Sequence, residues 1–268
     1  MSSLCTADDV TQFQRDGFLI VKNLITAEEV DLLGEVARAD QLLSQSAYSR
    51  QDASGQATTL AVRNDLSDDI YSTIARSNRV VSRVTLLLDG EVYHYHHKLI
   101  FKEPRVGGAW EWHQDYGYWY HNGCLLPDMA SCMIAIDRAT EENGCLQVLR
   151  GSHVMGRVDH GKTGDQTGAD LERVDIALKR FELVHVTLEP GDAVIFHANL
   201  LHRSDQNRSD HPRWALICCY NTRRNDPYKE SRHPCYSQLD VCEDEEILVA
   251  GQRQLASLHN HAGESAAM

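Results

Sequence analysis

Two residues with metal-binding side chains, His113 and Asp115, stand two positions apart in a stretch crowded with aromatic residues. On an extended backbone, side chains at positions i and i+2 point to the same side of a strand, so the imidazole and the carboxylate can bind one ion together. A histidine from a distant strand would complete a set of two histidines and one carboxylate. Such a set holds one face of an Fe(II) ion and leaves positions open for a co-substrate and dioxygen. The spacing therefore predicts a metal-dependent oxygenase.

Two histidines further along the chain are candidates for the third ligand. His202 follows shortly after the apolar run 193–196, and His197 stands at the end of that run. A histidine in the position of His197 ordinarily lies at the edge of a core and is bonded to the backbone. The chain has 14 histidines, so a pair of solvated polar residues would also explain His113 and Asp115. The residues alone leave both choices open.

An arginine, Arg213, follows the candidate ligand His202 in the sequence. Arg213 lies beyond the polar stretch 204–212, at the start of an apolar run that we expect to be a strand. Arginine offers a planar, two-pronged donor that matches a carboxylate, and a buried arginine needs such a partner. We therefore expect Arg213 to bind a carboxylate. The alternative is a surface arginine paired with Asp210.

The aromatic residues around His113 are the main indication of a substrate. Flat tryptophan and tyrosine faces attract cationic or zwitterionic ligands. The alternative is that these rings pack the rim of a barrel. The candidate substrate residues are Trp110, Trp112, Tyr116, Tyr118 and Trp119.

Composition narrows the class of protein. With 26 Lys and Arg against 39 Asp and Glu, the formal net charge is −13, which argues against nucleic acid and anionic membranes as partners. The first residues lack the pattern of a secretory signal, and no apolar run approaches the roughly 20 residues of a membrane span. The eight cysteines form no C-x-x-C pair. We therefore expect reduced thiols, a cytoplasmic location and a small-molecule partner. The pattern carries no information on the oligomeric state.

The first ninety residues predict mostly helix. Thr6 and Thr26 each precede an acidic residue at the third following position, as in a capping box, and the second of these opens a helix over residues 30–39. Residues 44–59 are rich in Ser, Gln, Ala and Gly and predict a loop. Residues 68–88 carry a helical stripe of apolar side chains.

Beyond residue 91 the periodicity changes to short strands separated by turn residues, which is typical of a β-sandwich or barrel. The expected strands are residues 94–102, 130–136, 145–149, 183–188, 193–196 and 214–221. Residues 156–182 resemble an insertion with a helix near 169–180, and residues 222–268 predict a partly ordered flap or tail. A chain of this length and hydrophobic content is consistent with one domain spanning residues 1–268.

These motifs, in this order, resemble the phytanoyl-CoA dioxygenase family of Fe(II)/2-oxoglutarate-dependent oxygenases, to which the ectoine hydroxylases belong. The resemblance covers about residues 12–221. The segments that carry it are 13–21, 113–115, 142–153, 190–197, 202–204 and Arg213. It implies a mainly β protein, a double-stranded β-helix of the jelly-roll or cupin kind, with the N-terminal helices packed outside the larger sheet.

The resemblance also assigns roles. His113, Asp115 and His202 would ligate iron, and Arg213 and Ser204 would hold the distal carboxylate of 2-oxoglutarate. The further residues expected near the co-substrate are Lys98, Lys102, Met133 and Gln114. Lys98 stands where we expect an apolar residue. Its expected role could therefore be a contact with the substrate instead of the co-substrate. Arg63 is a weaker candidate for a carboxylate contact.

The implied reaction hydroxylates a C–H bond of a small molecule, consumes dioxygen and 2-oxoglutarate, and releases succinate and carbon dioxide. Asp115 favours hydroxylation, since the halogenases that resemble this family have a small residue there. The aromatic stretch favours an amino-acid-like or zwitterionic substrate over a CoA thioester, with residues 44–59 or those after 222 closing over it. Two alternatives remain, a metal-binding lyase or isomerase of the cupin type and a non-catalytic binding protein of the same fold.

Overall fold

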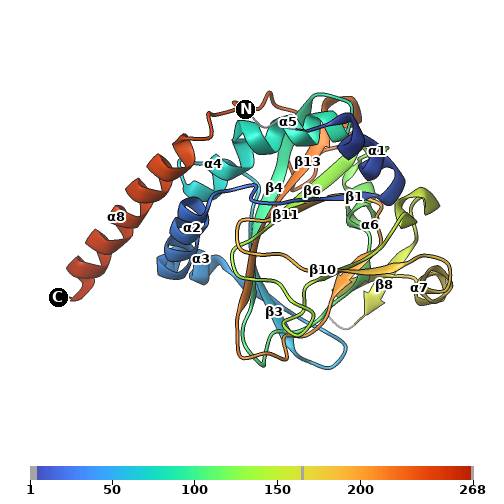
Figure 1. Ribbon diagram of the computed structural model, residues 1–268, viewed down its shortest axis with the longest axis horizontal. Coiled ribbons are helices and arrows are strands. Elements are labelled where there is room, and N and C mark those ends of the chain that lie inside the picture. The colour runs from blue at the N-terminus through green and yellow to red at the C-terminus, as the bar shows by residue number, and fades with distance from the viewer. Residues whose placement is uncertain (1–4, 164–165, 267–268) are drawn as a thin grey trace.

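Strands from both halves of the chain form a seven-stranded antiparallel sheet in the computed structural model, which describes residues 5–163 and 166–266 (Figure 1). Across this larger sheet the strands are β1 (Phe18–Val21), β11 (Ala193–His197), β6 (Met129–Ala135), β13 (Arg213–Thr222), β4 (Val92–Lys102), β3 (Ala57–Arg63) and β2 (Tyr48–Gln51). Neighbouring strands pair in antiparallel registers, with one shift between β4 and β13. Five of the seven match or extend the expected strands or follow from an apolar run; β2 and most of β3 do not.

A second, four-stranded antiparallel sheet faces the first. Its strands, in order, are β10 (Leu183–Val186), β7 (Leu146–Leu149), β12 (His202–Ser204) and β5 (Trp110–His113). Apolar side chains of both sheets form one buried cluster between them, as Met133, Val148 and Val194 illustrate. Alternate residues of each strand point into this cluster, as the period of two requires. The predicted double-stranded β-helix is confirmed.

Helices cover the outer face of the larger sheet, with a separate apolar cluster between them and the strands. Figure 1 shows these helices along one side of the sheet. They are α1 (Ala7–Asp16), α2 (Ala27–Ala39), α3 (Gln41–Ser46), α4 (Ile70–Arg76), α5 (Asn78–Leu87) and α8 (Glu246–Ala266). Both predicted capping boxes, at Thr6 and Thr26, are present. Among the described residues no helix has the length and hydrophobicity to cross a membrane.

The helix expected over residues 68–88 is two helices. Ser77 has an extended backbone (φ −66°, ψ 143°) and serves both as the C-cap of α4 and as the N-cap of α5. The backbone N–H of Asn78 donates to the carbonyl of Cys242, and the N–H of Cys242 donates to the carbonyl of Arg76. A later segment of the chain therefore replaces the helical hydrogen bonds at this break, which the local apolar stripe does not reveal.

Two expectations about segments without regular structure are wrong. Residues 44–59, expected to be a loop, contain β2 and the start of β3. Residues 222–268, expected to be a flap or tail, contain the 21-residue helix α8. Gly251 hides that helix in the sequence, because glycine disfavours a helix interior. A Cβ atom at Gly251 would lie 2.6 Å from the side chain of Leu32, so glycine is what lets α8 approach α2.

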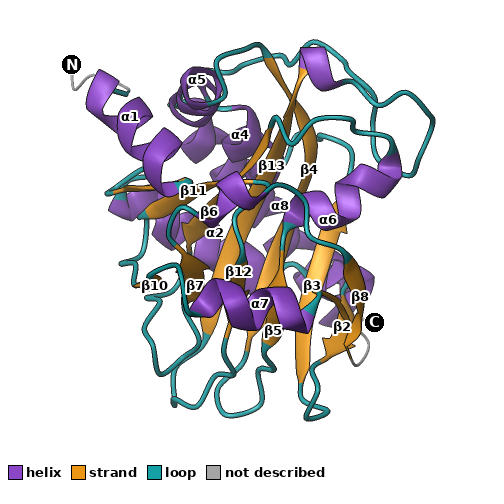
Figure 2. Cartoon of the chain, turned by 90° about the vertical axis from the view of Figure 1, so that its right-hand side faces the viewer, coloured by secondary structure: helices purple, strands orange, loops and turns teal. Residues whose placement is uncertain are grey.

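The expected insertion, residues 156–182, covers the outside of the smaller sheet. Its regular elements are the hairpin β8 (His160–Thr163) with β9 (Gln166–Ala169) and the helix α7 (Leu171–Leu178). Figure 2 shows α7 in front of β12 and β5, and Val174 and Ala177 of this helix pack in one cluster with Trp112. Short helical turns complete the chain: α6 (Asp115–Trp119), η1 (Tyr120–Asn122), η2 (Ser152–Met155) and η3 (Arg223–Asn225).

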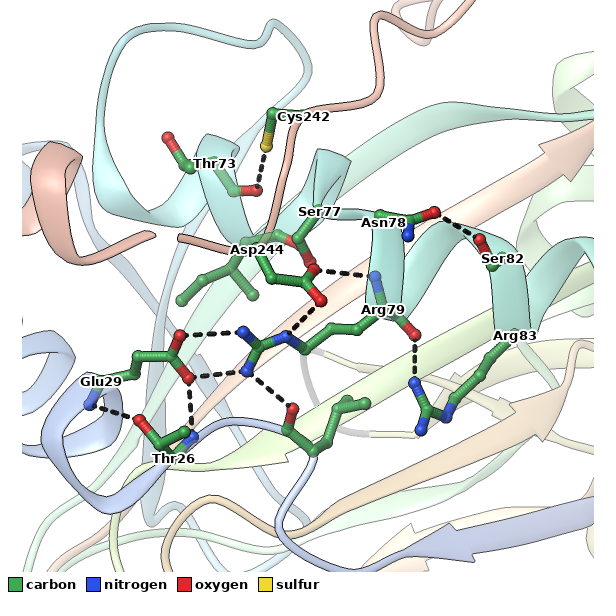
Figure 3. A network of polar contacts seen from close by, with 12 residues as sticks. Thr26, Glu29, Thr73, Ser77, Asn78, Arg79, Ser82, Arg83, Cys242 and Asp244 are labelled. Carbon is green, nitrogen blue, oxygen red and sulfur yellow. Dashed lines mark hydrogen bonds and ion pairs between the residues drawn. The ribbon is translucent and has the colours of Figure 1, made fainter. Parts of the chain in front are cut away.

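A buried ionic network fixes the C-terminal segment to the helices (Figure 3). Arg79 of α5 donates to both carboxylate oxygens of Glu29, at 2.7 and 3.0 Å, and its Nε lies 3.1 Å from a carboxylate oxygen of Asp244. It also donates to the carbonyl of Leu24. One guanidinium thus joins α5, the start of α2 and the end of the segment 226–245. That segment, which runs past the mouth of the barrel, is held at its far end.

Candidate active site

His113, Asp115 and His202 meet inside the barrel. His113 ends β5, His202 begins β12, and the two residues are direct partners in the register of these strands. Gln114 between the first two residues is extended (φ −113°, ψ 136°), so the side chains of His113 and Asp115 lie on the same side. Asp115 Oδ1 is 3.8 Å from His113 Nε2 and 3.9 Å from His202 Nε2. All three residues are buried, and their ligand atoms lie within 4.8 Å of one another.

The hydrogen bonds of the two histidines set their tautomers. His113 Nδ1 lies 2.7 Å from the carbonyl of Glu111, and His202 Nδ1 lies 2.9 Å from the carbonyl of Leu200. Because a carbonyl only accepts, each Nδ1 carries the proton and each Nε2 offers a lone pair toward the centre of the cluster. Burial lowers the pKa of both imidazoles, most strongly that of His113, which favours the neutral form that binds metals. Two nitrogens and one carboxylate oxygen are a donor set that suits Fe(II).

A serine that the sequence analysis missed fixes the carboxylate. Ser131 Oγ donates to Asp115 Oδ2 at 2.7 Å and lies 3.3 Å from Cys219 Sγ. One oxygen of Asp115 is thereby occupied, and the other faces the two histidines. The sequence did hold a signal, since Ser131 is the one hydroxyl in the otherwise apolar strand β6. A buried hydroxyl needs a hydrogen-bond partner, and its partner here lies on another element.

A cavity, here called the inner cavity, extends from the triad into the barrel. Most of the residues expected at the co-substrate line it: Lys98, Lys102, Met133, Ser204 and Arg213. Its walls are otherwise largely apolar, with Leu146, Phe196 and Ile217 among them. Lys98 lies near the triad, whereas Lys102 and Arg213, which are partners in the register of β4 and β13, lie four residues further along these strands.

Arg213 is 3% exposed and has no carboxylate within 4.0 Å among the described residues. Its Nε has no hydrogen-bond partner there. Burial lowers its pKa to about 10, so the guanidinium is still charged at neutral pH. The alternative pairing with Asp210 is wrong, because Asp210 is bonded to Arg105 at 2.8 Å. A buried charge without a partner costs free energy, and an anionic ligand in the inner cavity would offset that cost.

A second cavity, here called the outer cavity, opens on the other side of the triad and shares His113, Asp115, Lys98 and Trp110 with the first. Tyr118 and Trp119 line it, as expected. Trp112 and Tyr116 do not, and for these two the predicted substrate contact is wrong. Trp112 packs under α7, and the hydroxyl of Tyr116 donates to the carbonyl of Cys124 in the core. The change from β5 to α6 after His113 sends the rings of this stretch in different directions.

A β-bulge in β4 places one further residue, His96, in the outer cavity. The register between β4 and β13 shifts at Tyr95, which has no partner of its own. The extra residue lets Tyr95 face the core while the next residue, His96, also faces inward. From there the usual alternation brings Lys98 to the triad. His96 is 5% exposed, and its Nδ1 has no hydrogen-bond partner in the described part of the chain.

Gln114 does not line either cavity, so its expected place at the co-substrate is wrong. Its amide donates to the carbonyls of Gly156 and Asn199, and its side-chain oxygen accepts from the N–H of Val158. Its own N–H donates to Nε2 of His160 in β8. Gln114 therefore holds the ligand-bearing segment against its neighbours. Next to it, a Cβ atom at position 117, where the chain has Gly117, would lie 2.2 Å from the ring of His160.

Two other candidates lie away from the site. His197 Nδ1 accepts from the N–H of Asn199, and its ring contacts Phe13, outside both cavities. On β3, Val62 lines the outer cavity, and the next residue, Arg63, points to the opposite face of the sheet. The guanidinium of Arg63 therefore belongs to the helix-covered face of the sheet.

Both segments named for closure contribute to the outer cavity. Tyr48 and Arg50 come from the segment 44–59, as part of β2, and Arg232 and His233 come from the segment that follows β13. His233 stacks on Tyr95, with ring centroids 4.7 Å apart. Closure by either segment stays a prediction.

Comparison with known proteins gives consistent matches. The family model described as phytanoyl-CoA dioxygenase matches residues 13–215. L-Proline trans-4-hydroxylase of Streptomyces griseoviridis is 30% identical over 243 residues, which cover 85% of this chain and 90% of that enzyme. Ectoine dioxygenase of Bordetella parapertussis is 28% identical over 237 residues, covering 82% and 76%. The crystal structure of EctD from S. alaskensis with 2-oxoglutarate and 5-hydroxyectoine has a TM-score of 0.73 at 22% identity, covering 90% and 89% of the two chains.

The geometry predicts which histidine retains the metal. Replacing His202 with alanine should abolish retention of Fe(II), because one of three ligands is lost. Replacing His197 with alanine should leave the metal content unchanged. Metal analysis after dialysis of the two variants measures this. Loss of iron in the His197 variant alone would show that the wrong histidine was chosen.

The Ser131 hydrogen bond predicts a second effect. Ser131→Ala should weaken Fe(II) affinity by about 10- to 100-fold, because Asp115 loses the contact that orients it. Competition with a chelator measures the affinity. The matched control is Ser72→Ala, which removes a buried hydroxyl from α4 in the helix layer. Equal affinities in the Ser131 variant and the wild type would contradict a positioning role for the hydroxyl.

Proposed function

The chain belongs to the phytanoyl-CoA dioxygenase family, and we propose that it hydroxylates a C–H bond of a small amino-acid-like molecule at the triad. The family and the dioxygenase class predicted from the sequence are confirmed by these matches. Fe(II) and 2-oxoglutarate are therefore its cofactor and co-substrate. In the proposal, His113, Asp115 and His202 hold the iron.

One observation carries the proposal for the co-substrate: Arg213 lines the inner cavity four residues along β13 from the level of Lys98 and has no carboxylate partner among the described residues. A lyase or isomerase of the cupin type has no need of a buried cation in this place. An elongated dicarboxylate that binds the metal with one end does need it. This contrast supports 2-oxoglutarate in the inner cavity, with its distal carboxylate on Arg213 and Ser204.

The chain's own residues orient the reactants and exclude water. The neutral imidazoles and the free oxygen of Asp115 offer three ligand atoms on one face of a metal ion. Met133, Leu146 and Ile217 line the inner cavity and would pack around the carbon chain of the co-substrate, where apolar walls exclude water and strengthen charged contacts. When bound, iron, 2-oxoglutarate and dioxygen supply the chemistry that yields succinate and carbon dioxide and places an oxygen atom on a substrate carbon.

The outer cavity supports a small substrate. Trp110, Tyr118 and Trp119 offer aromatic faces near the triad, which suit an amphipathic or zwitterionic molecule. Two of the relatives are named for L-proline and ectoine, and the first of them aligns with 85% of this chain. Both names indicate small molecules, and their use here as a guide to the substrate is part of the proposal.

The role of Arg213 predicts the effect of its removal. Arg213→Ala should retain iron but raise the KM for 2-oxoglutarate by about 30- to 3,000-fold, because breaking a buried charged pair costs about 2 to 5 kcal/mol. Succinate formation as a function of 2-oxoglutarate concentration measures this. The control is Arg105→Ala, which removes an exposed arginine paired with Asp210. An unchanged requirement for 2-oxoglutarate in the Arg213 variant would remove the assignment.

The proposed reaction predicts which compounds stimulate turnover. With Fe(II) and 2-oxoglutarate, small amino acids and their cyclic derivatives should raise succinate release above the substrate-free background. Mass spectrometry should then find a product that is heavier by one oxygen atom. Long acyl-CoA thioesters should leave succinate at background. If acyl-CoA thioesters are instead the best substrates, the small-molecule proposal is wrong while the dioxygenase class stands.

A further inference from the structure

The outer cavity carries an excess of positive charge. Arg50, Lys98, Lys162 and Arg232 line it, and among its described lining residues the single carboxylate belongs to Asp115. Asp115 faces the two histidines and is bonded to Ser131. Among the described residues that line the cavity, no acidic group is therefore left to neutralise the four cationic side chains. An anion bound in the outer cavity would do so.

This charge contrasts with the rest of the protein, whose formal net charge is −13. Elsewhere arginines pair with nearby acids, as Arg79 does with Glu29 and Arg150 does with Glu182. In the described part of the chain, no carboxylate lies within 4.0 Å of any of the four cations of the outer cavity. Cations that line a cleft without partners attract anions and raise their local concentration.

Lys98 occupies the inner position of the four. It is half-buried, lies beside the triad and borders both cavities. The charges of Fe(II), Asp115, 2-oxoglutarate and Arg213 add to zero, so Lys98 is left without a counter-charge. Lys102 supplies no counter-charge to Lys98, since it is itself a cationic residue type, and its amino group donates to the carbonyl of Asp205. A half-buried ammonium group without a partner favours a bound anion.

The other three cations lie at the mouth. Arg50 comes from β2, Lys162 from β8 and Arg232 from the segment after β13, and all three are exposed. The guanidinium of Arg50 stacks on the ring of Tyr48, with 5.3 Å between them, so its position is supported by a neutral group. The outer cavity thus has one cationic group beside the metal and further cationic groups spread around its entrance.

We propose that the substrate is a small molecule of net negative charge with two anionic groups, such as a dicarboxylic amino acid. Lys98 binds one carboxylate beside the iron, and Arg232, whose carbonyl accepts a hydrogen bond from Asn64 just beyond Val62, binds the second at the mouth. This inference rests on the proposed function and narrows its substrate class. A net-neutral amino acid would leave the mouth cations unpaired, and a cationic one would be repelled.

The same contacts disfavour a long acyl thioester. Its phosphates would suit the mouth, but its acyl chain would then run past Lys98 and His96 to reach the triad. Apolar contact would remove water from an ammonium group and from an imidazole that has no other partner for its Nδ1. Leaving polar groups unpaired in this way is unfavourable.

Binding and turnover measured separately test the inference. The Fe(II)-loaded enzyme, saturated with 2-oxoglutarate and kept free of oxygen, is titrated by calorimetry with L-glutamate, L-proline, L-lysine and decanoyl-CoA. L-Glutamate should bind most tightly. Lys98→Gln should weaken its binding by about 10- to 100-fold, the effect of losing a charged hydrogen bond. Arg232→Gln should weaken it less, because that group is exposed. Lys179→Gln, which removes an exposed cation from the end of α7, should have no effect.

Each contrary result has a distinct meaning. Affinities that do not depend on ligand charge, or tighter binding of L-proline or decanoyl-CoA, would overturn the inference. So would a Lys98→Gln variant that needs more 2-oxoglutarate but binds L-glutamate normally, since Lys98 would then serve the co-substrate. Admitting oxygen and measuring succinate separates the two proposals. If L-glutamate binds tightly but releases no succinate, the anion site is supported and the proposed hydroxylase is contradicted. If L-proline alone is turned over, the hydroxylase is supported and the anion site is contradicted.

Discussion

The pairing of β12 with β5 is the interaction on which the active site depends. It sets His202 directly opposite His113, with ring centroids 4.0 Å apart, although the two residues lie far apart in the sequence. Hydrogen bonds to β7 on the other edge of β12 keep the register from slipping. A slip by one residue would turn His202 to the opposite face and separate the ligands. The strands therefore act as the frame of the metal site, and the burial of three polar ligands is compensated when an ion binds.

Charge is distributed in two different ways in this molecule. On the outer surface, arginines and acids neutralise one another, and such exposed pairs contribute little to stability. Inside the barrel, Arg213 and Lys98 stand in cavities without carboxylate partners among the described residues. Keeping these groups unpaired costs stability in the ligand-free protein. This loss of stability is expected for a preorganised site, because its dipoles and charges are already in place when the ligands arrive.

The sequence predicted the features that depend on neighbouring residues. The spacing of His113 and Asp115, the capping boxes and most strands are local patterns, and family resemblance supplied His202 and Arg213. The missed features depend on distant partners. Ser131 matters because Asp115 lies across the barrel, His96 faces inward because of a bulge against β13, and Trp112 is covered by α7. The helix α8 was not predicted because Gly251 disfavours a helix when only local sequence is considered. In the structure, Gly251 allows α8 to pack closely against α2.

The contact between Gly117 and His160 has a consequence for how this site can change over evolutionary time. The imidazole occupies the space of a side chain at position 117, and its Nε2 accepts from the backbone of Gln114. A larger residue at 117 would expel the ring and leave that N–H unsatisfied, so neither position tolerates substitution independently. The two are epistatic. In evolution, the hairpin β8–β9 and the segment after β5 therefore have to change together.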